Sequence, residues 1–146
     1  MGDPKHNHNP GPTRGFTLVE LMITIAVLTL LTAIAIPAYN GYIREGHLTT
    51  IRANMSGLRT ILEDYRLDNG NYGAAGDLVG LAAINARFNW NPSGDMGSYN
   101  YTISVTGTDS YDVLGLFNTS IWARCDDRFT SCCDPDTPGA TSAACP

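Results

Sequence analysis

The chain has 146 residues and a formal net charge of −5, which allows one small domain and disfavours nucleic acid as a partner. Its cysteines cluster towards one end, a pattern typical of disulfides formed in an oxidising compartment: Cys125, Cys132, Cys133 and Cys145. We find no nucleophile–histidine–acid set, glycine-rich phosphate loop or metal-ligand spacing, so we expect neither an enzyme nor a cofactor or metal site.

Residues 1–15 are polar and rich in proline, glycine and asparagine, so they cannot form a core or hold a helix. We interpret them as a leader peptide. Arg14 then lies beside the apolar run that follows, on the side retained in the cytoplasm.

An apolar segment extends from Phe16 to Pro37 and contains one charged residue, Glu20. As a helix, 16–36 would be about 30 Å long, enough to cross a bilayer. A carboxylate inside such a segment is costly in lipid, which indicates a functional residue with a partner. We expect the hydroxyls of the segment to bond carbonyls one turn back (Thr17, Thr24, Thr29 and Thr32) and Pro37 to kink or loosen the helix.

Residues 38–146 are predicted to form a globular head. Apolar residues recur at steps of three and four, which predicts an amphipathic helix ending near Asp68 at the Asn69-Gly70 stop signal: Leu48, Ile51, Met55, Leu58, Leu62 and Tyr65.

Four arginines form a stripe beside that apolar face, at intervals of seven or eight residues: Arg44, Arg52, Arg59 and Arg66. The favoured interpretation of this arginine stripe is a solvated edge near Glu45, Glu63 and Asp64. The alternatives are a contact with acidic loops of a neighbouring subunit and, least favoured, DNA binding.

After a long connection over 71–98, the sequence predicts a small antiparallel sheet. A short helix is expected over 77–88 within the connection, capped by Asp77. Alternating or strand-like patterns predict strands over 99–105, 111–117 and 119–125. Joined by turns, these strands give a meander with one face free to lie on the amphipathic helix, an α+β fold.

The segment 126–146 has no hydrophobic period and needs disulfides to stay ordered. A bond between the adjacent Cys132 and Cys133 would be strained. Two pairings remain open: Cys125–Cys132 with Cys133–Cys145, or Cys125–Cys133 with Cys132–Cys145. The acidic residues of this segment lack the spacing of an EF-hand loop, so solvated turns are favoured over a calcium site: Asp126, Asp127, Asp134 and Asp136.

The run Gly-Phe-Thr-Leu-Val-Glu over 15–20, followed by apolar residues and Pro37, resembles the N-terminus of type IV pilins and their pseudopilin relatives. The resemblance implies that a prepilin peptidase cuts between Gly15 and Phe16 and methylates the new Phe16 amine. It also implies that Glu20 pairs with the Phe16 amine of a neighbouring subunit, and that the helix unwinds near Pro37 on assembly. A disulfide-bounded loop near the C-terminus is common in the family.

The function that the resemblance implies is that of a type IVa-like pilus subunit, either major or minor. The alternatives are a type II secretion pseudopilin and a DNA-binding minor pilin. The implied partners are other pilin subunits in a helical homo- or hetero-polymer, the prepilin peptidase, the inner-membrane assembly platform and, before assembly, the membrane itself. The chain would begin in the bacterial inner membrane, with its head in the periplasm, and finish in an extracellular pilus.

Overall fold

The computed structural model describes residues 15–94, 97–143 and 145. The expected leader, residues 1–15, therefore lies outside the described residues except for Gly15. The chain divides between Asn40 and Gly41 into two compact units.

The longest element is helix α1 (Leu18–Asn69), which contributes to both units. The helix continues through Pro37, although proline lacks the amide donor of a regular helical turn. It ends where the sequence predicts. Gly70 has the left-handed φ of 75°, and its N–H donates to the Arg66 carbonyl at 2.7 Å.

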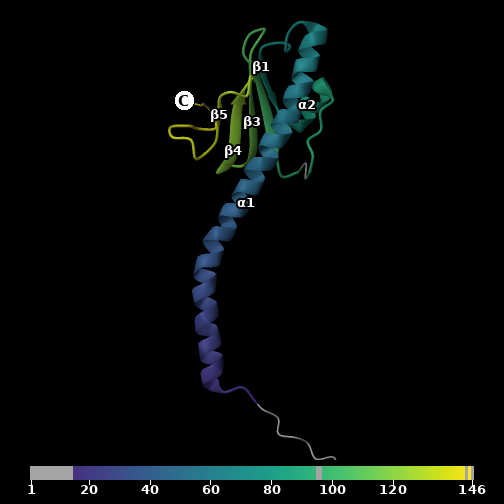
Figure 1. Cartoon of the computed structure of the whole chain (residues 1–146). Helices are drawn as coiled ribbons and strands as arrows, with labels where there is room; N and C mark the ends of the chain where they lie inside the picture. The colour runs from purple at the N-terminus through teal and green to yellow at the C-terminus, as the bar shows by residue number, and fades with distance from the viewer. Residues whose placement is uncertain (1–14, 95–96, 144, 146) are drawn as a thin grey trace, which may run out of the picture. The chain divides into compact units, whose positions relative to one another are not determined.

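The second unit contains a five-stranded antiparallel sheet in the order β1-β2-β3-β4-β5 (Figure 1). The strands are β1 (Gly76–Val79), β2 (Asn100–Val105), β3 (Tyr111–Asn118), β4 (Ile121–Asp126) and β5 (Cys132–Cys133). Every strand pairs with the next one along the chain, so the sheet is a meander. Together with α1 it forms the predicted α+β fold.

The core of this unit lies between the sheet and the apolar face of α1. Alternate residues of β2 and β3 point inwards and are buried, among them Tyr101, Ile103 and Tyr111. On α1, five of the six residues named by the sequence pattern are buried, and Tyr65 packs against them partly buried. Burial raises the pKa of the Tyr101 and Tyr111 phenols.

Gly115 on β3 allows the closest approach of the sheet to α1. A Cβ at this position would overlap the Cγ2 methyl of Ile51 and lie 3.1 Å from the Tyr101 ring and 3.3 Å from the Met55 sulfur. The absence of a side chain at Gly115 therefore determines how closely the helix can pack.

One predicted element is wrong in its first third. The short helix α2 (Leu81–Phe88) begins four residues after Asp77, which lies in β1 and pairs with Ser104 instead of capping a helix. Gly80, with φ of 87°, separates the strand from the helix. The 77–80 stretch pairs with β2 because that strand would otherwise leave an open edge, a tertiary effect that outweighs local helix propensity.

The connection between α2 and β2 is fastened to α1 by a buried asparagine. The Asn54 side chain is 5% exposed; it donates to the Tyr101 hydroxyl at 2.9 Å and accepts from the Ser93 N–H at 3.0 Å. Trp90 lies under the same connection, edge-on to Tyr101 with ring centroids 5.1 Å apart. Trp90 is thus a packing residue of the core.

Candidate processing and assembly site

The start of α1 is fixed by reciprocal hydrogen bonds between Thr17 and Glu20. The Glu20 N–H donates to the Thr17 hydroxyl at 3.1 Å, while the Thr17 N–H and hydroxyl both donate to Glu20 Oε2 at 3.2 Å. This arrangement is a capping box, which satisfies backbone donors that a helix leaves unpaired at its first turn.

The capping box corrects the expectation that Thr17 is an ordinary helical residue bonding a carbonyl one turn back. Thr17 precedes the helix and caps it, because no carbonyl lies one turn behind it in the helix. The other three threonines behave as expected: Thr24, Thr29 and Thr32 donate to carbonyls three or four residues earlier. The pattern Thr-x-x-Glu at 17–20 is the sequence signal that predicts this capping box.

The two residues flanking the expected cleavage point are accessible. Gly15 and Phe16 precede the helix, the Phe16 side chain is 88% exposed, and nothing lies within 4 Å of a Cβ built at Gly15. Among the described residues, none therefore obstructs this peptide bond.

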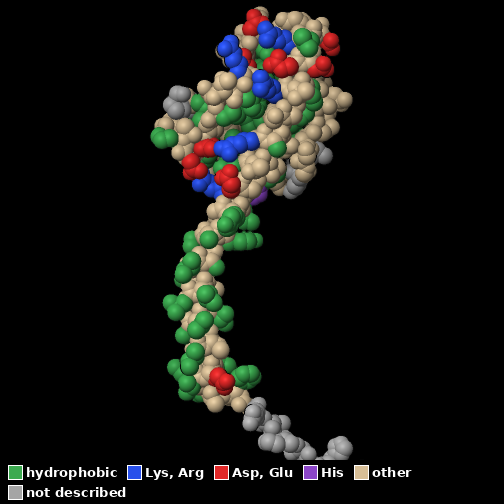
Figure 2. Space-filling model, viewed as in Figure 1, with side chains coloured by type: hydrophobic (Ala, Val, Ile, Leu, Met, Phe, Trp, Pro, Cys, Tyr) green, Lys and Arg blue, Asp and Glu red, His purple; other side chains and the backbone are tan. Residues whose placement is uncertain are grey.

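The N-terminal part of α1 has its apolar side chains exposed around the whole helix. Every residue from Gly15 to Ile43 is exposed, and Figure 2 shows hydrophobic side chains along the length of this segment. By length and composition, α1 includes a stretch able to cross a membrane. A surface of this kind requires a partner, either lipid or protein.

The arginine stripe is engaged within its own chain. Arg44 pairs with Asp136 at 2.7 Å, and Arg52 pairs with Asp134. The hydrogen bond from Arg44 to Asp136 raises the pKa of Arg44.

The remaining two arginines of the stripe, Arg59 and Arg66, also contact partners within the chain. Arg66 pairs with Asp109, in the turn between β2 and β3, at 3.0 Å, and Arg59 lies over the Phe129 ring at 5.4 Å. The stripe lies at a partly exposed edge, as predicted, and Arg52 is also 3.8 Å from Glu45; in addition, the stripe fastens the β2–β3 turn and the C-terminal loop to α1. This role needs acidic residues far away in sequence, which the helix pattern alone does not reveal.

The C-terminal segment is held by two disulfides, Cys125–Cys132 and Cys133–Cys145. This is one of the two pairings that the sequence left open. The first bond closes the turn between β4 and β5, and the second ties residue 145 back to β5.

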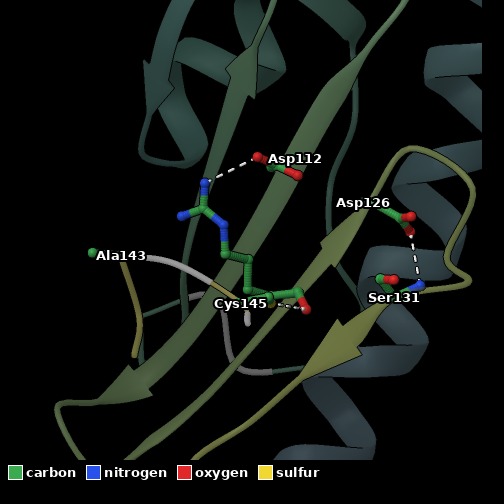
Figure 3. A pocket seen from close by; sticks show the side chains of 6 residues that line it. Asp112, Asp126, Ser131, Ala143 and Cys145 are labelled. Atoms are coloured by element: carbon green, nitrogen blue, oxygen red, sulfur yellow. Dashed lines mark hydrogen bonds and ion pairs between the residues drawn. The ribbon is translucent and has the colours of Figure 1, made fainter. Parts of the chain in front are cut away.

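A pocket of about 290 Å³ lies beside this segment, between β3, β4 and the C-terminal residues (Figure 3). Its polar groups already have partners. Arg124 donates to Asp112 at 3.1 Å and to the Ser142 carbonyl at 3.2 Å, and Asp126 accepts from the Ser131 N–H at 3.2 Å. Among the described residues, the charged side chains that line the pocket are therefore already paired within the chain.

No group of three or more His, Cys, Asp or Glu side chains suited to a metal ion is found among the described residues. The acidic residues of the C-terminal segment serve other purposes: Asp134 and Asp136 bind arginines, and Asp126 caps its own turn. The structure thus shows protein partners for three of the four aspartates considered for calcium.

The features at the start of α1 define a class of protein. The family profile described as the prokaryotic N-terminal methylation motif matches residues 12–36. Over 141 residues, covering 90% of each chain, the sequence is 30% identical to prepilin peptidase-dependent protein D of Escherichia coli (strain K12).

Two further relatives are fimbrial proteins. The type IV major fimbrial protein FimA of Dichelobacter nodosus is 42% identical over 55 residues, which is 38% of this chain and 35% of FimA. The fimbrial protein of Neisseria meningitidis (serogroup A / serotype 4A) is 25% identical over 115 residues, 78% of this chain and 68% of that one. The chain belongs to the type IV pilin family, whose members are structural rather than catalytic. No solved structure matches it.

Proposed function

We propose that the chain is a structural subunit of a type IV pilus, processed between Gly15 and Phe16 and polymerised through residues 16–37. The observation that carries the proposal is an exposed apolar helix with one carboxylate, Glu20, in its first turn. In a filament, the apolar surface would pack against the same segment of other subunits and leave lipid.

The geometry of Glu20 leaves one of its oxygens free for a neighbour. Both hydrogen bonds from Thr17 go to Oε2, and Oε1 has no partner within the described residues. A carboxylate in a dry filament core is strongly penalised unless it is paired. The amine of Phe16 on the next subunit, created by cleavage, would supply the opposite charge without breaking the cap.

Before assembly, residues 16–37 would anchor the subunit in the inner membrane. Residues 38–146 would form the head, and we place it in the periplasm because its two disulfides require an oxidising compartment. The prepilin peptidase would remove residues 1–15, and an inner-membrane assembly platform would extract the anchor into the growing filament.

The direct test is mass spectrometry of filaments sheared from cells that express the chain together with a type IV assembly system. We expect a mature chain that starts with N-methylated Phe16. The Gly15→Val variant should remain full-length in the membrane, because valine is too bulky for a protease site that takes a small residue. A mature-sized band from that variant, or filaments built from the uncut chain, would contradict the cleavage site.

Three variants separate the two roles of Glu20. Glu20→Gln keeps a side chain that can complete a capping box but removes the charge, so filaments should be lost. Glu20→Ala should fail in the same way. Thr17→Val removes the cap but keeps the carboxylate; it should cost about 1 kcal/mol of helix stability and still assemble. All three should insert and be cleaved. Normal filament yield from Glu20→Gln would refute the charge pairing.

The type II secretion pseudopilin and the DNA-binding minor pilin remain the alternative functions. Within the proposed function, abundance distinguishes a major from a minor subunit, because a major subunit is the dominant protein of sheared pili whereas a minor subunit is a trace component. DNA binding would require arginines that are free to meet phosphates, and Arg52 and Arg59 already have partners in the chain. Salt-sensitive DNA binding that is lost in the Arg52→Ala/Arg59→Ala variant would support that alternative.

A further inference from the structure

A notch of about 220 Å³ lies between the last turns of α1 and the C-terminal end of α2. Its apolar part is formed by Ile61, Tyr65 and Phe88, and the two rings meet edge to face with centroids 5.0 Å apart. The face of an aromatic ring attracts a cationic side chain, and apolar surface covers its aliphatic stem.

The notch also carries two carboxylates without partners. Asp64 and Asp68 are exposed, lie one helical turn apart, and form no ion pair or hydrogen bond within the described residues. Because α1 ends at Asn69, both stand near the negative end of the helix dipole, where a carboxylate is unfavourable. In the isolated subunit these two charges are therefore uncompensated.

Arg87 is the one cation that lines the notch among the described residues, and it does not neutralise the pair. Its guanidinium lies over the Phe88 ring at 5.8 Å and packs so closely on the Gly73 backbone that a Cβ there would overlap it. With two carboxylates, one guanidinium and the helix end, the notch keeps a negative potential that suits a second cation.

A survey of the arginines in the described part of the chain points to one occupant. Four form ion pairs with carboxylates, namely Arg44, Arg52, Arg66 and Arg124, and two lie over aromatic rings, namely Arg59 and Arg87. Arg128 is exposed and has no partner of either kind within the described residues. It is thus the cation that this part of the chain has available for a neighbour.

Arg128 is presented on a rigid tip. It lies in the turn between β4 and β5, whose base is closed by the Cys125–Cys132 disulfide. Inside the turn, the Asp126 carboxylate accepts the N–H groups of Thr130 and Ser131 at 3.0 and 3.2 Å. A side chain held on such a turn loses little backbone freedom on binding, which favours a specific contact.

The two surfaces lie at different edges of the sheet. The notch belongs to the β1 side, because α2 packs on β1 and β2, whereas the Arg128 turn joins β4 to β5. A contact between two different patches of the same chain is heterologous, and such contacts build open helical filaments when the rotation between subunits does not close a ring. Complementary charge and placement on opposite edges thus favour a second copy of this chain as the partner.

We propose that Arg128 of one subunit docks into the Asp64–Asp68 notch of the next. This inference rests on the proposed function, since it assigns a contact between heads in the filament. It adds to the packing of the N-terminal helices a second, polar contact that sets the orientation of neighbouring heads.

The first test places the photo-crosslinking amino acid p-benzoylphenylalanine at position 67 of the full chain in cells with an assembly system, because Leu67 is 84% exposed beside Asp68 and its replacement keeps Arg128 and both carboxylates. Illumination of the filaments should yield covalent dimers of this chain, with attachment mapped to residues 126–130. Filaments with attachment only elsewhere, to another protein, or with none would overturn the docking and leave the proposed function intact. Failure of the unaltered chain to enter filaments would instead overturn the proposed function, and the docking with it.

The second test exchanges the charges. Arg128→Glu and Asp68→Arg should each lower the yield of sheared filaments about fivefold, and their combination should recover it to within about twofold. Asp77→Arg, which makes the same change on an exposed carboxylate of β1, is the matched control and should leave the yield unchanged. Equal loss in the combined variant and in the singles would overturn the pairing. The crosslinking test decides the question if a charge variant does not accumulate.

Discussion

Replacing Gly115 by alanine tests how closely the sheet packs on α1. The added methyl would overlap the Cγ2 atom of Ile51, whose side chain is fully buried, and would press on Tyr101 and Met55. Overpacking of this kind costs about 1–3 kcal/mol. The lower backbone entropy of alanine in the unfolded chain offsets about 0.5–1 kcal/mol of this loss in the free energy of unfolding. We therefore expect Gly115→Ala to lower the free energy of unfolding by about 1–2 kcal/mol.

The assay is thermal unfolding of the full chain in detergent under oxidising conditions, followed by near-ultraviolet circular dichroism. A loss of about 1 kcal/mol lowers Tm by about 4–8 °C for a domain of this size. The decisive control is Ile51→Leu, which conserves volume but moves the branch from Cβ to Cγ and so removes the methyl that the new side chain at position 115 would meet. The double variant should be more stable than the sum of the two single changes predicts.

A Gly115→Ala variant as stable as the unaltered chain would refute this reasoning, because it would mean that α1 moves away from the sheet at little cost. Strict additivity in the double variant would also refute it. In that case the loss would come from some contact other than the one between positions 115 and 51.

Three further predictions concern the head. Asp134→Ala removes an ion pair to Arg52 and the hydrogen bonds that shape its turn, so it should lower the free energy of unfolding in urea by about 1–2 kcal/mol. Asp136→Ala should cost less, because the Asp136 side chain is 65% exposed and that of Asp134 only 16%; equal losses would contradict this order. Opening the Cys133–Cys145 loop by a double change to serine should cost about 3 kcal/mol, measured in the same way, and an unchanged midpoint would show that the loop contributes nothing. Burial raises the pKa of Tyr111 above its unfolded value of about 10, so the contribution of Tyr111 to stability should be constant below about pH 10 and be lost above it. Tyr111→Phe should make the alkaline decline in stability less steep, and an unchanged alkaline slope would assign the decline to other groups.

Most of the elements were predictable because they depend on short-range patterns. The steps of three and four from Leu48 to Leu62 locate the buried face of α1, and alternation locates β2. The two strands that the sequence pattern missed, β1 and β5, are four and two residues long. Segments this short carry too little periodicity to be recognised, and they become strands only because a neighbouring strand is already there to pair with them.

Part of the candidate site could also be predicted from the sequence, namely the capping box, although the expectation for Thr17 overlooked it. Thr17 and Glu20 are three residues apart, so their hydrogen bonds depend on local geometry alone. The arginine stripe is the opposite case. Its spacing is visible in the sequence, but its partners Asp109, Asp134 and Asp136 come from loops whose position depends on the sheet and the disulfides.

The sequence by itself determined the features that need no distant contact: the apolar segment, its single carboxylate, the cap, the amphipathic helix and the motif of the type IV pilin family. Tertiary structure decided which cysteines are joined, which arginines are neutralised internally, and that Arg128 and the Asp64–Asp68 notch are left without partners in the described part of the chain. The physical reason is the distance along the chain over which each kind of interaction acts. Helix periodicity and capping act over a few residues, whereas charge pairing and disulfide geometry depend on segments that only the folded sheet brings together.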